Sequence, residues 1–287
     1  MEKKMNKIGI SIVTYNPNLE KLNNALNVYK KLNLSVNIYD NGSKNYTQLK
    51  KMSIKFSNIY IITENKNLGI AYALNKNFAL SKKHGLKWVI TFDQDSVITE
   101  ESLKKYLVDI SKLSTDSQIA IICTKVLDKN TGKIIFGKGT HYERIKDPQN
   151  IITSGSCIRV SSWENIDKFN DELFIDFVDT DFQERILLNG FKIVRCNNIV
   201  LVHEIGKTTD KKIGPFIIHC SNHNSFRRYY MVRNRLFFYR KYYGYFPYIG
   251  ALIRLSLGTL KIVLFEKEKK LKVYAFLKGW RDYRKLM

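Results

Sequence analysis

The chain is poor in proline, in acidic residues and in patterned cysteines. Its 287 residues include only four Pro, and no Pro-rich, Gly/Ser-rich or repetitive tract occurs. With 44% hydrophobic and 13% aromatic residues, this composition excludes disordered and fibrous proteins and indicates a globular fold. The cysteines lack CxxC spacing, so we expect free buried thiols and neither disulfides nor a zinc site. They are Cys123, Cys157, Cys196 and Cys220.

Glycine-rich phosphate loops and export signals are also missing. No GxGxxG or GxxxxGKS/T motif follows any predicted strand, which disfavours dinucleotide-binding and phosphate-loop folds. The basic segment Met1–Lys7 leads into a short apolar run that Ser11 and Thr14 interrupt, which does not match a signal peptide. We therefore expect a protein of the reducing cytoplasm.

Positive charge is abundant and unevenly distributed. The chain has 48 Lys and Arg against 26 acidic residues, a formal charge of +22. Residues 1–204 contribute +7 of this charge and residues 205–287 contribute +15. Such an excess indicates a polyanionic partner, such as nucleic acid, phospholipid or a phosphorylated substrate. The C-terminal region is the part that we expect to meet it.

Strand and helix patterns alternate in the first third of the sequence, which predicts a parallel sheet. The predicted strands are Ile8–Val13, Val36–Tyr39, Ile59–Thr63 and Trp88–Phe92. The predicted helices are Leu19–Leu32, Leu68–Ser81 and Glu100–Leu113. Residues 119–202 extend the sheet, with strands at Ile119–Val126, Ile134–Phe136, Phe191–Val194 and Ile199–Val202 and a helix from about Asp179 to Asn189.

The residues just after the first four strands are unusually polar. They read Thr14-Tyr15-Asn16, Asp40-Asn41-Gly42-Ser43, Glu64 to Gly69, and Asp93-Gln94-Asp95. In open sheets of this class, ligands bind in the crevice at the carboxyl ends of the strands. These four segments are therefore the candidate ligand site.

Three acidic residues at these strand ends each allow a functional and a structural interpretation. Asp93 and Asp95 can hold a divalent cation through oxygen ligands, or they can cap the next helix or face water. Asp40 can accept the N3–H of a pyrimidine base, or it can belong to an ordinary Asp-Asn-Gly-Ser turn.

Asn67, Gly69 and His203 are further candidates. Asn67 can cap the following helix and bring its positive end near a phosphate, with Gly69 permitting close backbone approach. His203 ends an apolar run, where its imidazole can complete a metal site or contact diphosphate. Helix capping, and a lone histidine with neither role, are the structural alternatives.

A second acidic cluster lies in residues 174–181, and one of its carboxylates can be a general base. Asp176, Asp179 and Asp181 stand among apolar residues, and burial there can raise a carboxyl pKa toward a useful range. Asp181 and Arg185 have the spacing of a helix ion pair, and a structural role is favoured for Asp176.

Taken together, these residues resemble the motif set of family-2 glycosyltransferases with the GT-A fold, from Ile8 to about Tyr243. Within that family the chain is most similar to rhamnosyltransferases. Three segments carry this similarity: Thr91 to Ser96, Phe174 to Asp181, and Tyr230 to Arg235. The resemblance implies an α/β fold with a Rossmann-like mixed sheet flanked by helices, and inverting sugar transfer assisted by Mg²⁺ or Mn²⁺.

The resemblance also implies roles for individual residues. It places Asp179 as the base, with Asp181 in reserve, and it matches His203 to a late histidine that joins Asp93 and Asp95 at the metal. The donor nucleotide-sugar would be held by Thr14, Tyr15, Asn16, Asp40, Asn41, Asn67, Gly69, Asp93, Gln94 and Asp95. The acceptor side would include Ser154, Gly155, Arg233 and Asn234.

The C-terminal region predicts contact with a membrane surface. Residues 226–248 hold eleven aromatic residues interleaved with Arg and Lys, and Ile249–Phe265 is largely apolar. A bilayer span needs about 20 mostly apolar residues, and Arg254 and Lys261 interrupt this run. We therefore expect a helix lying in the interface near anionic headgroups. A solvated or oligomer-forming helical pair is the alternative.

These observations lead to one hypothesis for the whole chain. Residues 1–223 would form the catalytic domain, and residues 224–287 a basic, aromatic helical extension at the inner face of the cell membrane. The donor would be dTDP-rhamnose or a UDP-hexose, because Asp40 cannot distinguish thymine from uracil by the N3–H alone. The acceptor would be a lipid-linked glycan. A nucleic-acid-binding role for Phe226–Tyr248 leaves the polar strand ends unexplained, so we expect no nucleic-acid partner.

Overall fold

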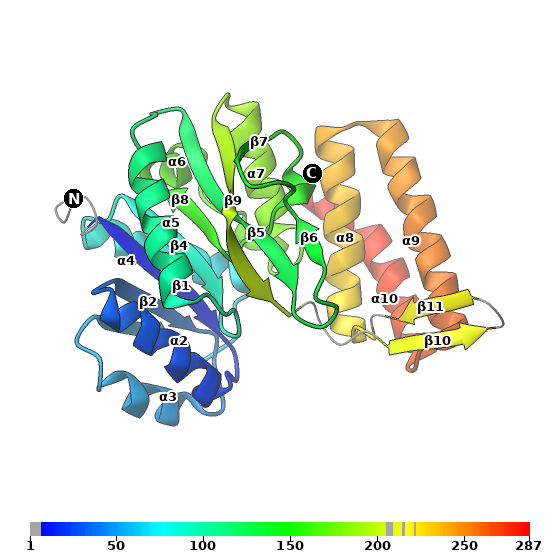
Figure 1. The fold of residues 1–287 in the computed structure, drawn as a ribbon. Helices are drawn as coiled ribbons and strands as arrows, with labels where there is room; N and C mark the ends of the chain where they lie inside the picture. Colours follow the sequence, from blue (N-terminus) through cyan, green and yellow to red (C-terminus); the bar gives the residue numbers. More distant parts are fainter. Residues whose placement is uncertain (1–6, 205–208, 214–215, 221) are drawn as a thin grey trace. The chain divides into compact units, whose positions relative to one another are not determined.

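The computed structural model describes residues 7–204, 209–213, 216–220 and 222–287. The chain divides into two compact units, whose elements are labelled in Figure 1. The first unit comprises Met1–Asp171 and Asp179–Ile205, and the second comprises Glu172–Val178 and Gly206–Met287. The expectation about Met1–Lys7 lies outside the described residues, apart from Lys7 itself.

The first unit is built on a nine-stranded mixed sheet. The strand order is β3-β2-β1-β4-β8-β5-β9-β7, with β6 paired to β5. The strands are β1 (Ile8–Thr14), β2 (Ser35–Asp40), β3 (Ile59–Thr63), β4 (Trp88–Asp93), β5 (Ile119–Asp128), β6 (Ile134–Phe136), β7 (Tyr142–Ile145), β8 (Ser156–Arg159) and β9 (Lys192–His203). The first four are parallel, which confirms the prediction from strand-helix alternation.

Helices of the first unit cover both faces of this sheet. They are α2 (Leu19–Lys31), α3 (Tyr46–Ser53), α4 (Ile70–Lys83), α5 (Glu100–Leu113), α6 (Val160–Asn165) and α7 (Val178–Leu188), with short 3-10 turns η1 (Pro148–Asn150) and η2 (Asp171–Leu173). Two of these elements extend into the second unit, which contains Glu172 and Leu173 of η2 and Val178, the first residue of α7. The predicted helix at Leu68 begins two residues later than expected, at Ile70.

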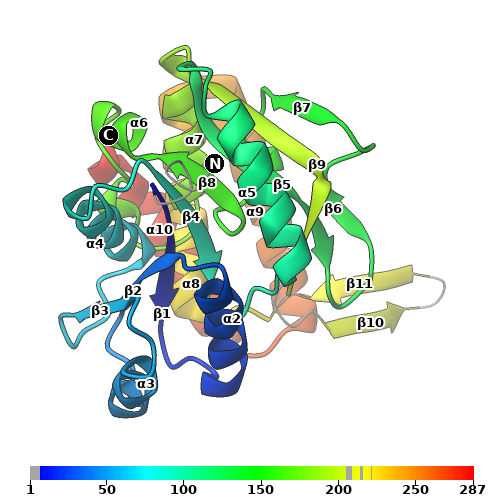
Figure 2. The ribbon, with the colours of Figure 1, turned by 60° about the vertical axis from the view of Figure 1, so that its left-hand side comes forward.

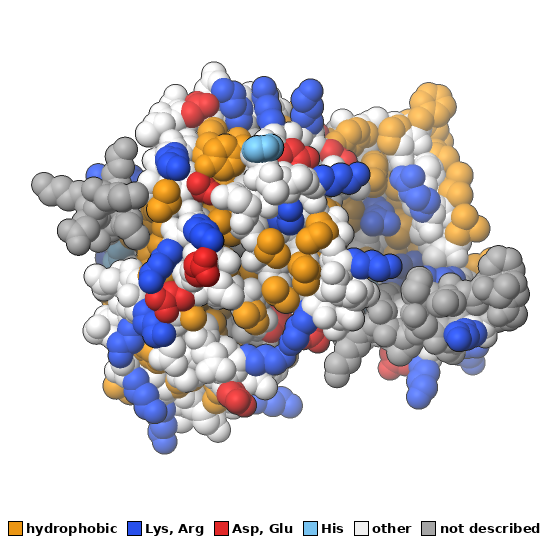
Figure 3. Space-filling model, viewed as in Figure 1, with side chains coloured by type: hydrophobic (Ala, Val, Ile, Leu, Met, Phe, Trp, Pro, Cys, Tyr) orange, Lys and Arg blue, Asp and Glu red, His pale blue; other side chains and the backbone are white. Residues whose placement is uncertain are grey.

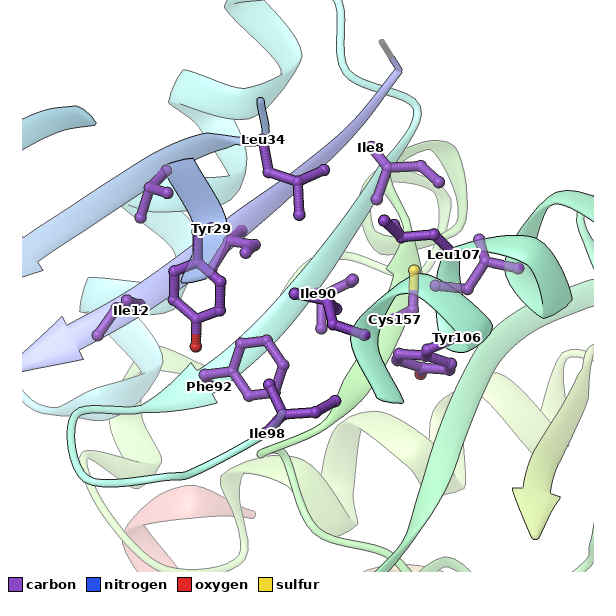
Figure 4. Close-up of a cluster of buried hydrophobic side chains, with 14 of the residues drawn as sticks. Ile8, Ile12, Tyr29, Leu34, Ile90, Phe92, Ile98, Tyr106, Leu107 and Cys157 are labelled. Atoms are coloured by element: carbon purple, nitrogen blue, oxygen red, sulfur yellow. The ribbon is translucent and has the colours of Figure 1, made fainter. Parts of the chain in front are cut away.

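Alternation along β1 explains why two layers form. Ile8, Ile10 and Ile12 join the buried cluster that also contains side chains of α2 and α5 (Figure 4), in which Tyr29 stacks on Phe92 with ring centroids 5.6 Å apart. Successive strand residues point to opposite faces, so the residues between these isoleucines face α4. There Ser11 accepts a hydrogen bond from Asn77 at 2.9 Å.

A second aromatic core fills the space among α4, α6 and α7. Phe78 of α4 contacts Trp163 of α6 and Phe169, with ring centroids 5.4 and 5.6 Å away. Phe169 in turn lies 4.3 Å from Phe182 of α7. All four side chains are buried, so α7 is fixed in the first unit by packing of its inner face.

The middle of the sheet differs from the sequence prediction in two places. Strand β8 was not predicted, yet it lies antiparallel between β4 and β5. The runs Phe191–Val194 and Ile199–Val202 were predicted as two strands and form one, β9, with a register shift against β5 between Thr124 and Lys125. At the end of β9, Val202 bridges Val97, which brings the end of β9 beside the loop that follows β4.

The second unit is mainly helical, which confirms the expected C-terminal helices. It contains α8 (Ser225–Tyr242), α9 (Tyr245–Phe265), α10 (Lys269–Asp282), the turn η3 (Tyr283–Leu286), and a hairpin of β10 (Thr209–Ile213) and β11 (Phe216–Cys220). Asn224 caps α8 by accepting from the backbone N–H of Arg227 at 2.9 Å. Gly279 lets α10 approach α8 closely, since a Cβ there would lie 2.8 Å from the Tyr229 carbonyl oxygen.

Candidate active site

The carboxyl ends of the parallel strands are tied together by side-chain hydrogen bonds in the first unit. Figure 2 shows β1 and β4 directed toward the same edge of the sheet. Thr14 at the end of β1 donates to Asp40 at the end of β2 over 2.9 Å. The Gln94 amide, after β4, accepts from the Tyr15 N–H at 2.8 Å and donates to the Tyr15 carbonyl at 3.3 Å. The predicted strand-end segments therefore form one contiguous edge.

Asp40 is the centre of the loop after β2. It is fully buried, and one carboxylate oxygen accepts from the backbone N–H groups of Gly42 and Ser43 at 3.2 and 2.9 Å. The other accepts from the hydroxyls of Thr14 and Ser43. Both oxygens are thus occupied by the loop and by Thr14 at the end of β1, and the two backbone N–H bonds are those that the turn interpretation of the sequence predicts. A contact between Asp40 and a nucleotide base requires one of these hydrogen bonds to be exchanged.

Asn41 connects the ends of β2 and β3. Its amide donates to the Gly69 carbonyl at 3.2 Å and accepts from the Leu68 N–H at 3.1 Å. Asn67 accepts from the Gly69 N–H at 3.0 Å. The prediction of Asn67 as a helix cap is wrong, because Gly69 caps α4 with φ +91°, a conformation that favours glycine. No side chain caps α4, so its first backbone N–H groups are left to other partners.

Tyr15 and Asn16 shape the loop after β1. The Tyr15 side chain is half exposed, as a ring that stacks on a ligand must be. Asn16 adopts φ +49°, its N–H donates to the Ser43 hydroxyl at 2.7 Å, and its side chain accepts from the Lys44 N–H at 2.8 Å. The loops after β1 and β2 are therefore one hydrogen-bonded structure with Tyr15 at its surface.

The acidic pair after β4 lies beside His203. Asp93 and Asp95 are both exposed, while Ser96 and Ser154 beneath them are buried. His203 Nδ1 is 3.8 Å from an Asp93 carboxylate oxygen and 3.5 Å from the Ser96 hydroxyl. Asp93 and His203, two of the three predicted metal-site residues, thus lie close together, and Asp95 follows Asp93 two residues later in the chain.

Ser154 and Gly155 were expected on the acceptor side, and the structure gives them a different role. The Ser154 hydroxyl is buried, accepts from the Asp93 N–H at 3.2 Å and lies 2.7 Å from the Ser96 hydroxyl. The Gly155 N–H donates to the Thr91 carbonyl at 2.8 Å. Both residues support the acidic loop from below, and Ser154 is too deeply buried to contact an acceptor.

Replacing Gly155 by Ala should lower the free energy of unfolding by about 2–4 kcal/mol. Gly155 has φ +79°, and a Cβ would lie 2.6 Å from the Thr124 hydroxyl oxygen. Gly85→Ala is the matched control, because Gly85 has φ +72° with nothing within 4 Å of its Cβ position. It should cost about 1 kcal/mol from backbone strain alone. Equal losses for both variants in urea unfolding would contradict the packing argument.

Asp179, in the first turn of α7, lies next to the segment that supports the acidic loop. Its carboxylate accepts from the Thr153 N–H at 3.2 Å and from the Thr180 N–H at 2.9 Å. Burial raises the pKa of Asp179 above its ordinary value, against the opposing effect of these hydrogen bonds. Thr153 is the neighbour of Ser154 in the chain, so two consecutive residues contact Asp179 and the Asp93 loop.

Asp181 has a structural environment. It is buried, and Arg185 forms an ion pair with it over 2.8 Å while also donating to the Lys168 carbonyl at 2.8 Å. Arg185 further donates to the Ile166 carbonyl. This is the helix ion pair that the sequence offered as the alternative, and it favours Asp179 over Asp181 as the base.

In the second unit, Asn234 and Arg233 of α8 hold the segment Glu172–Val178. The fully buried Asn234 amide donates to the carbonyls of Leu173, Ile175 and Asp176, each at 2.8 Å. Arg233 donates to the Glu172 carbonyl at 2.5 Å. Asn234 is fully buried and its amide group is bound to these three carbonyls. Contrary to the prediction, it therefore cannot contact an acceptor directly.

Comparison with known proteins shows the family to which this chain belongs. The family profile described as Glycosyl transferase family 2 matches residues 10–159. The dTDP-rhamnosyl transferase RfbF of Shigella flexneri is 33% identical over 243 residues, which are 80% of this chain and 79% of RfbF. The chain belongs to glycosyl transferase family 2. The predicted family membership is thereby confirmed.

Solved structures show the same fold for this glycosyltransferase. The crystal structure of S. aureus TarS matches with a TM-score of 0.55 and 16% identity, over 97% of this chain and 54% of TarS. A TarS fragment, residues 1–349, matches with a TM-score of 0.51 over 98% of this chain and 92% of the fragment. The glycosyltransferase thus has the mixed sheet of the GT-A type with C-terminal helices, as predicted.

Three residues that shape the glycosyltransferase site had no individual role assigned from the sequence. Ser43 bonds both Asp40 and Asn16, Ser96 contacts both Ser154 and His203, and Thr153 donates to Asp179. Ser43 follows Asp40 by three residues and Ser96 follows Asp95 directly, so their closeness to predicted site residues could have indicated them. Thr153 contacts Asp179 through both its backbone N–H and its side chain, and it lies 26 residues before Asp179 in the chain, so no local pattern connected the two.

Proposed function

We propose that this enzyme transfers rhamnose from dTDP-rhamnose to a glycan acceptor, with inversion, in the synthesis of a cell-surface polysaccharide. The likeness to RfbF supports the donor, since RfbF is described as a dTDP-rhamnosyl transferase. The observation that carries the reaction type is the Thr153–Ser154 pair, which connects Asp179 to the Asp93 loop. The candidate base and the loop of the candidate donor-diphosphate site therefore contact adjacent residues of one segment.

In the proposed reaction, Asp179 takes the proton of the acceptor hydroxyl while the hydroxyl oxygen attacks the anomeric carbon. The new bond joins that oxygen to the anomeric carbon, and the bond from the anomeric carbon to the diphosphate oxygen breaks on the opposite side. The electron pair leaves with the diphosphate. A pKa raised by burial suits Asp179 to this task, because a stronger base accepts the proton more readily.

Tyr15, Asn16 and Asp40 would surround the nucleotide base in this proposal. Tyr15 offers an exposed ring beside the loop that Asp40 organises. Thymine and uracil present the same N3–H, so a UDP-hexose remains the second candidate donor. Thymine differs from uracil by its C5-methyl group, so a site that prefers dTDP must contact this methyl group.

Donor identity can be tested by measuring nucleoside-diphosphate release from a panel of dTDP- and UDP-sugars. Lipid-linked glycans extracted from membranes of the producing cells serve as acceptors. We expect turnover with dTDP-rhamnose and little with UDP-hexoses. Turnover with a UDP-hexose alone would keep the mechanism and replace the proposed sugar, and release that does not depend on the acceptor would contradict transfer.

The acidic loop fits a divalent cation that binds together with the donor. Mg²⁺ and Mn²⁺ prefer oxygen ligands, which the exposed Asp93 and Asp95 offer, and His203 is next to Asp93. Among the described residues, no group of three His, Cys, Asp or Glu side chains forms a preassembled metal site. The donor diphosphate would therefore complete the ligand set. When bound, the cation would stabilise negative charge on the leaving diphosphate.

We also propose that α9 lies on the inner face of the cell membrane, where a lipid-linked acceptor would be found. In the part of the chain that the structure describes, α9 is the one helix long and apolar enough to cross a membrane, although a core helix can meet the same criterion. Its buried side packs within the second unit. Its exposed apolar side, visible in Figure 3, includes Ile253, Leu257, Leu260 and Leu264. Arg254 and Lys261 on the same helix suit anionic headgroups.

Replacing Leu257 and Leu260 by Glu should weaken binding to vesicles containing anionic lipid at least about tenfold. Each leucine is more than half exposed, so the change removes apolar contact with lipid without disturbing the packed side of α9. Ile54→Glu is the matched control, since Ile54 is 76% exposed and lies in the first unit, after α3. Vesicle flotation measures the effect. Undiminished flotation of the double variant would contradict α9 as the membrane contact.

A further inference from the structure

An aromatic ledge in the second unit has no role in the reaction as described above. The ledge consists of Phe174, Phe226 and Tyr230. Phe174 and Tyr230 stack with ring centroids 4.9 Å apart and an interplanar angle of 16°. Phe226 packs edge-on against both rings, at 5.6 and 5.1 Å, and remains 53% exposed. Three rings are therefore held in a fixed arrangement, with Phe226 exposed to solvent and Phe174 and Tyr230 half-buried beside it.

The segment that carries Phe174 is held in a conformation that costs free energy. Phe174, Asp176 and Phe177 have φ values of +62°, +62° and +64°, which non-glycine residues rarely adopt. Asn234 maintains the segment through its three carbonyl contacts. Backbone strain of this kind persists only where the surrounding structure enforces it, and it is concentrated at functional sites.

Charged hydrogen-bonding groups border the ledge. Asp176 accepts two hydrogen bonds from the Arg227 guanidinium, at 3.2 and 3.0 Å. The Arg233 guanidinium lies over the Tyr230 ring, 4.8 Å from its centroid. A sugar ring has apolar C–H faces and a rim of hydroxyl groups, so it matches an aromatic surface bordered by a carboxylate and guanidinium groups. An arginine side chain has five N–H donors, and Arg227 gives two of them to Asp176, so it can also donate to sugar hydroxyl groups, which a lipid chain lacks.

Chain length limits how far the ledge can lie from the proposed base. Phe174 precedes Asp179 by five residues, and a fully extended chain covers at most about 3.6 Å per residue. Their Cα atoms are therefore within about 18 Å, the length of a short oligosaccharide. We propose that the aromatic ledge binds a sugar ring of the acceptor glycan, next to the sugar that is extended or one or two units from it. This inference rests on the proposed glycosyl transfer to a glycan.

Phe226→Ala tests the proposal, with oligosaccharides released from the extracted lipid-linked glycans as the probe. Saturation-transfer NMR with the full chain and no donor should show acceptor binding weakened about threefold to tenfold, the usual contribution of one aromatic contact. Phe226→Trp should keep the affinity and Phe226→Leu should not, because the proposal requires an aromatic face. Unchanged binding in Phe226→Ala, or full affinity in Phe226→Leu, would overturn it.

Steady-state kinetics separates this inference from the proposed function. Phe226→Ala should raise the KM for the acceptor by a similar factor, with the KM for the donor and kcat unchanged. Tyr274→Ala is the matched control, since Tyr274 is 63% exposed and lies on α10 of the same unit, away from the proposed membrane side of α9. If the wild-type enzyme uses a donor other than dTDP-rhamnose, the proposed function is corrected, but the inference about acceptor binding at the ledge still stands. Equal effects of the Phe226 and Tyr274 variants would contradict binding at the ledge.

Discussion

Asp179→Asn should lower kcat by about 10²–10⁴-fold, the usual contribution of general base catalysis. The amide keeps the size of the carboxylate and can still accept from the Thr153 N–H, but it cannot take a proton from the acceptor hydroxyl. The donor and acceptor KM values should change little, because the substitution removes an interaction of the transition state. The measurement is acceptor-dependent nucleoside-diphosphate release at saturating substrates.

Stability provides the control for this variant. Because the pKa of Asp179 is raised in the folded protein, its ionised form opposes folding at neutral pH, and Asp179→Asn should unfold at the same or a higher temperature. Asp181→Asn should show the opposite pattern. It breaks a buried ion pair with Arg185 and should lose about 3 kcal/mol of stability, while the protein that remains folded keeps its kcat. If Asp181→Asn in fully folded protein lost as much activity as Asp179→Asn, the assignment would be wrong.

The raised pKa of Asp179 also predicts a pH dependence. The base works only when it is ionised, so kcat/KM should fall as the pH decreases through this raised pKa. The acidic limb of the profile should therefore lie above the value of about 3.9 for an ordinary aspartate. A limb at or below that value would show that a different group controls the reaction.

Asp95→Ala should lower the rate of transfer about 10²–10³-fold, because the loop would lose a cation ligand near the leaving diphosphate. Asp95 is exposed after β4, so the substitution should change the free energy of unfolding by no more than about 0.5 kcal/mol. Donor turnover across a titration of Mn²⁺ measures the effect, and excess metal should recover part of the activity.

Glu101→Ala is the control for the loss of a surface carboxylate. The Glu101 side chain is 78% exposed on α5 and forms an ion pair with Lys105. Its removal should leave turnover and metal dependence unchanged. Full activity of Asp95→Ala at low metal concentration would remove the basis for a cation at this loop.

Much of the first unit could be predicted from the sequence, because its strands are apolar runs with clear ends. Strand β8 could not, since it is only four residues long and is stabilised as a strand by pairing with β4 and β5 on either side. Asn197 and Asn198 lie between the two strands that were predicted where β9 forms. In the structure they continue the strand, and their amides donate to Glu143 and Asp109.

In the candidate site, too, the sequence predicted some features and missed others. Convergence of the strand ends followed from the parallel order, and the bonds from Thr14 to Asp40 and between Tyr15 and Gln94 confirm it. The roles of Ser154 and Asn234 did not follow. Each depends on a partner more than fifty residues away in the chain, which local patterns do not reveal.

The central claim is that Asp179 assists a single displacement at the anomeric carbon, and the configuration of the product tests it most directly. NMR of the glycan formed by the wild-type enzyme, using the donor that it turns over, reports the anomeric configuration of the new linkage. We expect a configuration opposite to that of the sugar in the donor. A product with the donor's configuration would contradict it, because retention requires a different course of bond formation at that carbon.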